Sequence, residues 1–162
     1  MSTPFVAILM GSDGDFPQIE PTLDTLRKLK IGFEVKLTCA QRTPDVTQAY
    51  VKEADKRGCA AFICSACNGT YLAEFVAANT ITPVVDIPGD NTVPSAQTEA
   101  GMPVANLTQG KAGAKNAAFL AAQMMALSDA DLAGRLREER AANAKIIEEK
   151  DAALQARLSQ QS

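Results

Sequence analysis

The sequence predicts one α/β domain built around a parallel sheet. Short apolar runs typical of strands alternate with longer segments whose apolar residues recur every three or four positions, as in helices. Such alternation favours right-handed crossovers and a sheet covered by helices on both faces. The chain of 162 residues is long enough for one such domain with a substantial core. No internal repeat or interdomain linker interrupts the pattern.

The expected elements follow one another in a regular order. The strands are expected at 4–10, 33–38, 60–64, 82–87 and 102–108, and the helices at 17–30, 44–58, within 70–80, 110–127 and 129–158. Pro44 in the first turn and Gly58 just past the end mark the second helix, and Gly32 is expected to end the first. The polar segment 89–101 predicts a loop. Five strands favour a flavodoxin-like, three-layer α/β/α fold with strand order 2-1-3-4-5.

Composition excludes several classes of function. The net charge of −3, the pI near 5.0 and the aromatic content of 5% provide no surface for DNA or RNA. The apolar runs are shorter than the roughly 20 residues of a membrane helix. No secretory signal opens the chain, so we expect a cytoplasmic protein. Free thiols are then expected at the four cysteines, Cys39, Cys59, Cys64 and Cys67.

The last part of the chain predicts a separate helical extension. We expect an α/β domain over 1–128 and an extension over 129–162 that packs on the same domain or on a neighbouring subunit. Mixed charges at helical spacing surround a sparse set of apolar residues, Leu132, Leu136, Ile147, Leu154 and Leu158. A sustained coiled coil is disfavoured because Arg140 and Asn143 interrupt the apolar seam.

Polar and small residues follow each of the first three expected strands. These segments are GSDGD (11–15), TCAQRTP (38–44) and CSACNG (64–69). The carboxyl ends of parallel strands meet at one edge, where ligands bind in folds of this class. In GSDGD, a hydroxyl and two carboxylates precede a helix N-terminus that favours anions. The alternative is a plain turn in which Asp15 caps the helix.

The other two segments also leave alternatives open. Arg42 stands where it could bind a phosphate or carboxylate in a bidentate pair, or form only a surface ion pair. Thr43 could cap the following helix. The CxxC of Cys64 and Cys67 is compatible with a redox pair or, with Cys39, part of a zinc site. A strand end of small residues that lets a ligand approach the backbone is favoured, and no metal is expected.

In this order, the three segments resemble the PurE family, N5-carboxyaminoimidazole ribonucleotide mutase, also called the AIR carboxylase catalytic subunit. Family members read VAIxMGSxSD, SAHRTPD, TxPVxxVP and GKAGAxNAALLAAQ, where this chain reads VAILMGSDGD, TCAQRTPD, TPVVDIP and GKAGAKNAAFLAAQ. The resemblance spans about residues 5 to 127. It implies a purine-biosynthetic enzyme, a homo-octamer and a site without metal or cofactor that binds an aminoimidazole ribonucleotide.

The resemblance also implies roles for individual residues. Ser12 and Asp15 would bind ribose and phosphate, and Arg42 would bind the phosphate. The backbone from Ser65 to Gly69 would approach the ring. The full expected binding set is Gly11, Ser12, Asp15, Cys39, Arg42, Ser65, Ala66, Asn68 and Gly69.

The chain departs from the family pattern at its expected ligand edge. The histidine that serves the family as acid–base group is Gln41 here, a second histidine is Tyr71, and the chain contains no histidine. An amide cannot exchange a proton near pH 7. The residues expected to take part in the chemistry are Gln41, Tyr71, Cys67 and Asp13.

Three functions follow from these departures. The first is carboxylation, decarboxylation or carboxylate transfer by an unusual route, with a carboxylate such as Asp13 carrying the proton. The second is a repurposed enzyme with another heterocyclic substrate and chemistry based on a cysteine, Tyr71 or Asp13. The third is a non-catalytic protein that binds the ligand.

Overall fold

The computed structural model describes residues 3–66, 71–89 and 99–160. Its sheet contains five parallel strands: β1 (Phe5–Met10), β2 (Gly32–Leu37), β3 (Cys59–Ala66), β4 (Val84–Pro88) and β5 (Ala105–Asn106). Their order is β2-β1-β3-β4-β5, which confirms the predicted topology. The last strand is much shorter than the expected 102–108, since only two of its residues pair with β4.

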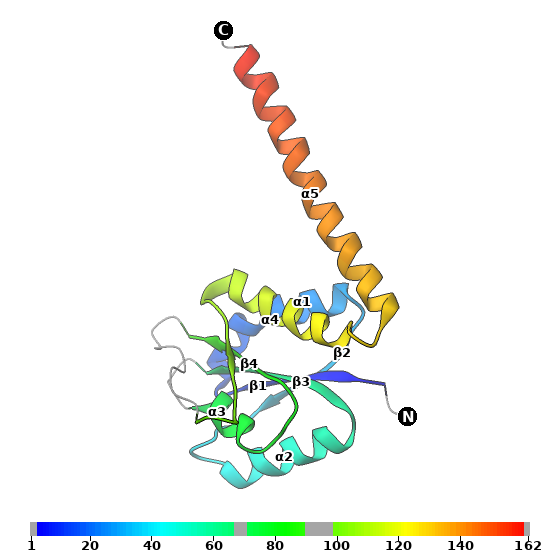
Figure 1. The fold of residues 1–162 in the computed structure, drawn as a ribbon. Coiled ribbons are helices and arrows are strands. Elements are labelled where there is room, and N and C mark those ends of the chain that lie inside the picture. The colour runs from blue at the N-terminus through cyan, green and yellow to red at the C-terminus, as the bar shows by residue number, and fades with distance from the viewer. Residues whose placement is uncertain (1–2, 67–70, 90–98, 161–162) are drawn as a thin grey trace.

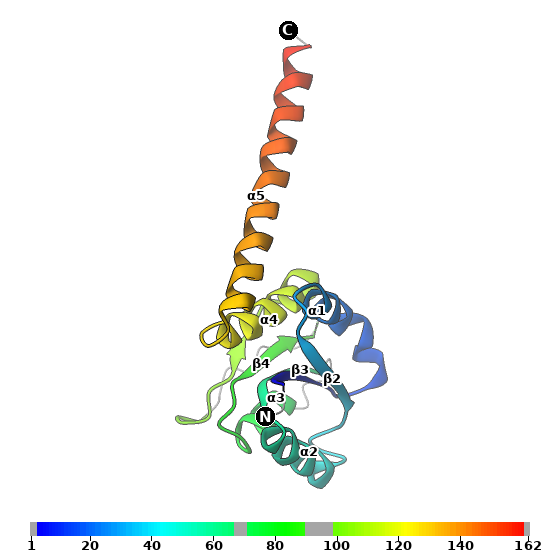
Figure 2. The ribbon, with the colours of Figure 1, turned by 90° about the vertical axis from the view of Figure 1, so that its right-hand side faces the viewer.

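Helices cover both faces of the sheet and make a flavodoxin-like three-layer structure (Figure 2). Helices α1 (Phe16–Lys28) and α4 (Gly110–Met125) lie on one face, and α2 (Pro44–Lys56) and α3 (Leu72–Ala77) on the other. A short 3₁₀ helix, Asp13–Asp15, precedes α1. The long helix α5 (Ala130–Ser159) rises from the α1/α4 layer and extends away from the body (Figure 1).

Alternation along the central strand separates two hydrophobic cores. In β1, Val6 and Ile8 point to the α1/α4 face, whereas Ala7 and Leu9 point to the α2/α3 face. All four side chains are fully buried. The continuous apolar run at the start of the sequence therefore reflects a strand covered on both sides.

Small residues allow α4 to approach its neighbours closely. A Cβ on Gly113 would lie 1.5 Å from the carbonyl oxygen of Thr108, so no larger residue fits there without a backbone shift. On the side facing α1, Thr22 donates a hydrogen bond of 2.8 Å to the carbonyl of Ala114. The alanine-rich sequence of α4 thus reflects close packing of this layer.

The end of α1 differs from the prediction. Lys30, not Gly32, reverses the chain, with a φ of 56°. Its N–H bonds the carbonyl of Arg27, and the N–H of Ile31 bonds the carbonyl of Leu26, as in a Schellman motif. Ile31 and Leu26 are both buried in the same core. This hydrophobic contact fixes the turn although the left-handed residue is a lysine.

The first turns of α5 are anchored to the body. The carboxylate of Asp129 accepts the N–H of Leu132 at 2.9 Å, and Leu132 is buried. Arg135 donates a hydrogen bond of 2.9 Å to the carbonyl of Leu29, and Lys28 pairs with Glu139. Within the described ranges, no helix combines the length and apolarity needed to cross a membrane.

Candidate functional site

Backbone hydrogen bonds join the ends of the first three strands at one edge of the sheet. The N–H of Thr38 bonds the carbonyl of Met10 at 3.0 Å, and the N–H of Gly11 bonds the carbonyl of Ser65 at 3.1 Å. The segments after β1, β2 and β3 therefore start side by side, as the sequence predicted for a parallel sheet. This carboxyl edge is the candidate site.

At the end of β1, the buried carboxylate of Asp15 closes the turn. It accepts the N–H of Ser12 at 2.8 Å, and the N–H of Asp15 bonds the carbonyl of Ser12 at 3.2 Å. Its carboxylate makes no cap hydrogen bond to α1, so the alternative in which Asp15 caps this helix is wrong. Asp13 and Gly14 are exposed at the tip of the turn. Asp15 therefore holds the shape of the corner, and Asp13 faces solvent.

At the end of β2, threonine hydroxyls hold the corner. The hydroxyl of Thr43 accepts the N–H of Cys39 and donates to its carbonyl, each at 3.0 Å. Thr38 contacts the hydroxyls of Thr43 and Thr47 at 3.2 and 2.6 Å. Although Thr43 stands at the N-cap position, its side chain caps no N–H of α2, because it is engaged with Cys39.

The tip of the same corner presents Gln41 and Arg42 to solvent. The N–H of Arg42 points to the sulfur of Cys39 at 3.4 Å, and the Arg42 guanidinium beside this thiol lowers the pKa of Cys39. Cys39 itself is buried, with 6% of its surface exposed. The arrangement favours the thiolate, but reagents reach it only if the corner opens.

At the end of β3, the edge is organised by Gln18, a residue of α1 that the sequence did not single out. The buried hydroxyl of Ser65 donates to the side-chain oxygen of Gln18 at 3.0 Å, and the Gln18 amide donates to the carbonyl of Pro88 at 2.8 Å. Gln18 on α1 thereby joins the ends of β3 and β4. Helical periodicity gave no signal for it, since its position lies between the apolar ones. Ala66 ends β3 and is half-buried.

Tyr71 stands immediately before α3 in a left-handed conformation, with a φ of 50°. Its side chain is 70% exposed. The other expected residues of this segment, Cys67, Asn68 and Gly69, lie outside the described residues.

The sequence profile of AIR carboxylase matches residues 5–146. The chain belongs to the AIR carboxylase family. It is 39% identical over 153 residues to the N5-carboxyaminoimidazole ribonucleotide mutase of Brucella melitensis, covering 90% of this chain and 94% of the relative. It is 37% identical over 145 residues to the mutase of Bacillus subtilis, covering 85% and 90%.

Solved structures agree with this assignment. A PurE from Treponema denticola superimposes with a TM-score of 0.81 at 26% identity, covering 93% of this chain and 98% of the other. A variant of PurE2 from the same organism gives a TM-score of 0.83 at 25% identity, covering 94% and 98%. The resemblance seen in the motifs therefore extends over the whole α/β domain.

This AIR carboxylase family member also has an acidic residue buried near the carboxyl edge. Asp86 lies two residues before the end of β4, level with Cys64 of β3, and only 9% of it is exposed. Burial, reinforced by the charge of Glu74 on α3, raises the pKa of Asp86 to about 7. Burial, followed by the charges of Asp86 and Glu74, raises the pKa of Cys64 well above its usual range. Asp86 is therefore equipped to exchange a proton near neutral pH.

The sequence contains a signal for Asp86, because its carboxylate is the single charge in the otherwise apolar run TPVVDI. No role was predicted for it. As for metals, no cluster of three or more histidine, cysteine, aspartate or glutamate side chains in the described part of the chain could hold an ion. Cys39, Cys59 and Cys64 are free thiols.

Proposed function

We propose that this protein binds an aminoimidazole-ribonucleotide-like ligand and adds, removes or transfers a carboxylate on it without a histidine. The observation that carries the proposal is the carboxyl edge, where the three family segments start side by side around Gly11 and Ser65. Membership of the AIR carboxylase family and relatives named as mutases support the same reaction class.

In this proposal, the exposed tips of the corners hold the ribose phosphate. Arg42 is exposed two residues before α2 begins, beside the Cys39 thiol, where helix N–H groups add a favourable field for an anion. Ser12 lies on the neighbouring corner. Because the threonine and Asp15 hydrogen bonds fix both corners, little reorganisation is needed on binding.

The proton carrier in this proposal is Asp86. A ring carbon that receives a carboxylate must lose its proton, and a ring carbon that loses a carboxylate must gain one. The family histidine position is Gln41 here, which cannot do this. Asp86 has a pKa of about 7 and lies on β4, two residues before the carboxyl end of the strand and level with Cys64 of β3. The earlier candidate Asp13 lies at the exposed tip of its turn instead.

We also propose that the chain works as a homo-oligomer in the cytoplasm. The resemblance to the PurE family suggests an octamer, and the buried free thiols Cys39, Cys59 and Cys64 suit a reducing compartment.

Steady-state kinetics with N5-carboxyaminoimidazole ribonucleotide test the proposal. We expect turnover by the wild type, a KM raised at least about tenfold in Arg42→Gln from loss of a charge-assisted pair, and no change in Lys52→Gln, an exposed cation on α2. Asp86→Asn is expected to lower kcat by about a hundredfold or more with little change in KM.

The remaining outcomes separate the alternatives. Full activity in Asp86→Asn, together with loss of activity in Asp13→Asn or Cys67→Ser, would assign proton transfer to Asp13 or Cys67, whichever substitution abolishes activity. Tight binding of the nucleotide without turnover would identify a non-catalytic ligand-binding protein. If the nucleotide shows no binding and no turnover, the nucleotide function is overturned. A different heterocyclic substrate then remains as the alternative.

A further inference from the structure

Asp86 is a buried carboxyl group that lacks a hydrogen-bond donor. Only 9% of its surface is exposed, and in the described part of the chain no group donates a hydrogen bond to its side chain. Burying a charged group without a partner costs free energy, so such a carboxyl is more stable with a proton than without one. A proton that leaves Asp86 therefore needs a path to water.

The strand pattern directs Asp86 away from α1 and α4. Its neighbours Val85 and Ile87 lie in the α1/α4 core, so the side chain of Asp86 between them points to the α2/α3 face. Its partner in register on β3 is Cys64, which is fully buried on the same face. Burial raises the pKa of the Cys64 thiol well above its usual range, so this thiol stays protonated near neutral pH. Cys64 therefore does not accept a proton from Asp86.

Glu74 is the charged side chain that α3 brings close to Asp86. Its charge acts on both Asp86 and Cys64. Four residues of α3 around it are buried: Leu72, Ala73, Val76 and Ala77. Glu74 itself is half-buried, so it stands where the α2/α3 core meets water. On the β5 side, the exposed Asn106 lies opposite Asp86, and an amide does not titrate. Of the titratable groups that the described residues place around Asp86, Glu74 is therefore the one in contact with water.

We propose that Glu74 is the outer member of a carboxyl pair with Asp86 and the positioning residue through which the proton of Asp86 reaches water. This role rests on the proposed function, in which Asp86 carries the proton. When carbon dioxide adds to a ring carbon, a C–C bond forms, the C–H bond breaks with its electron pair left in the ring, and the proton goes to the Asp86 carboxylate. Asp86 passes this proton to the Glu74 carboxylate, and Glu74 gives it to a base in solution. Removal of a carboxylate runs the same steps in reverse.

Infrared spectroscopy of the full-length protein tests the pair without ligand or turnover. The band of the protonated Asp86 carboxyl is the one that Asp86→Asn removes. In Glu74→Gln, this band is expected to disappear at a pH lower than in the wild type by about half a unit or more, because the nearby negative charge that favours the protonated form is gone. An unchanged titration of this band would overturn the pair.

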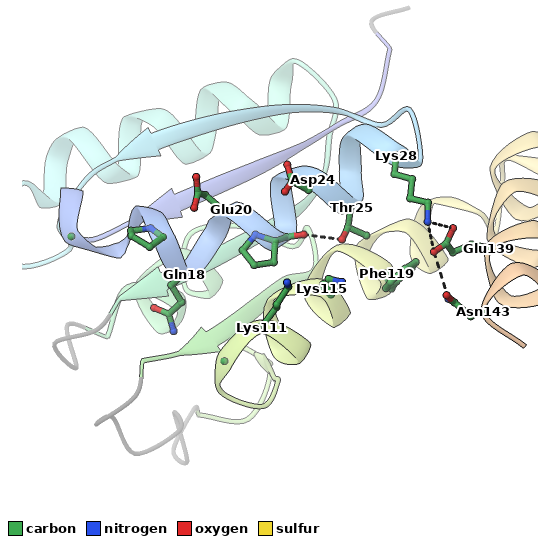
Figure 3. Close-up of a pocket in the computed structure, with 14 residues that line it drawn as sticks. Gln18, Glu20, Asp24, Thr25, Lys28, Lys111, Lys115, Phe119, Glu139 and Asn143 are labelled. Atoms are coloured by element: carbon green, nitrogen blue, oxygen red, sulfur yellow. Dashed lines mark hydrogen bonds and ion pairs between the residues drawn. The ribbon is translucent and has the colours of Figure 1, made fainter. Parts of the chain in front are cut away.

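Glu20→Gln is the matched control for the loss of one carboxylate. Glu20 is exposed on α1, on the other side of the sheet, where it lines a groove of about 860 Å³ between α1 and α4 (Figure 3). Because the sheet separates Glu20 from Asp86, this substitution is expected to leave both the titration of Asp86 and turnover unchanged. A shift as large as that in Glu74→Gln would assign the effect to general surface charge and overturn the pair.

The relay itself is tested by steady-state kinetics. Glu74→Gln is expected to lower kcat about tenfold with KM unchanged, whereas Glu74→Asp keeps a carboxylate and should keep most of the activity. Glu74→Ala leaves room for a small carboxylate, so added formate should restore part of its kcat and leave the wild type unchanged.

The outcomes separate the relay from the proposed function. With an active wild type, an unchanged kcat in Glu74→Gln, or a loss in Glu74→Ala that formate does not reduce, would overturn the relay alone. An inactive wild type would overturn the proposed function and the relay together, while the infrared titration would still decide whether the two carboxyls are paired.

Discussion

The two faces of the sheet are built from different chemistry. The face under α1 and α4 is a continuous apolar core in which isoleucine and valine from the strands meet leucines of α1 and alanines of α4. The face under α2 and α3 contains the buried thiols Cys59 and Cys64 and the buried carboxyl of Asp86, and at its edge Glu34 pairs with Arg57.

This difference separates two tasks within one small domain. Close packing between α1 and α4 makes a rigid layer on one face of the sheet. The α2/α3 face instead keeps titratable groups out of water, where their pKa values move far from the ordinary ones. The comparison predicts that substitutions on the first face act on stability alone and that those on the second change with pH.

The largest effect is expected from neighbouring residues of β3 that point to opposite faces. Ile63 lies in the α1/α4 core and Cys64 in the α2/α3 core, and both are fully buried. Ile63→Ala should lower the free energy of unfolding by about 2–5 kcal/mol through lost contacts and a cavity. Cys64→Ala removes only a sulfur and should lower it by about 1 kcal/mol. Urea unfolding measures both, and equal losses would break the comparison.

A pH-dependent effect of intermediate size is expected at Asp86. Its carboxyl has a pKa of about 7 in the folded protein against 3.8 ordinarily, so between these values the folded chain binds the proton more than the unfolded chain does. Stability from this group is complete below about pH 4 and falls as pH rises towards 7. Asp86→Asn should remove this fall and raise stability at pH 8 by at most about 4 kcal/mol.

Thermal unfolding at pH 4, 6 and 8 measures the difference at Asp86, with the exposed Glu148→Gln as control. A parallel pH dependence in Asp86→Asn and the wild type would show that this carboxyl ionises normally in the fold. In combination with the kinetics, the expected result is a variant that is more stable and less active at neutral pH.

The smallest effect is expected at the edge strand β2. Glu34 accepts hydrogen bonds from Arg57 and Tyr50, and the bond from Arg57 is the main reason why the pKa of Glu34 lies below its usual value. Both partners of the ion pair are partly exposed, so water and salt weaken it. Glu34→Gln should lower the melting temperature by about 2 °C or less at pH 7.

A depressed carboxyl pKa contributes stability above its ordinary value of 4.5 and loses it as pH falls. The difference between Glu34→Gln and the wild type should therefore disappear near pH 3, and it should shrink in 1 M salt, where screening lengths fall to about 3 Å. A difference that persists at pH 3 would assign the effect to packing against Tyr50 instead.

Much of the fold could be predicted because local pattern and global topology agree. The run in β1, the apolar spacing of α1 and the Pro44 and Gly58 punctuation each indicated the element that formed, and strand order followed from right-handed crossovers. Gly58 ends α2 with a φ of 92°, as its position predicted. The prediction that Gly32 ends α1 was wrong, because Lys30 adopts the left-handed conformation there and Ile31 packs in the same buried core as Leu26.

The candidate site could be predicted only in outline. Strand topology alone fixes that the segments after β1, β2 and β3 meet, so their position needed no side-chain detail. The bonds of Thr43 and Asp15 could not be predicted, because a capping residue can turn to the helix or to the preceding turn at similar cost. The raised pKa of Asp86 depends mainly on its burial and then on the nearby charge of Glu74 on α3, neither of which periodicity reveals.

Tyr71 carries a further consequence of its left-handed backbone. For a residue with a Cβ this conformation costs about 1–2 kcal/mol, and a glycine would adopt it freely. The aromatic ring recovers little of that cost through burial, since most of it faces water. A bulky, exposed ring in a position suited to glycine therefore adds a local cost in stability at the start of α3, which a Tyr71→Gly substitution would relieve.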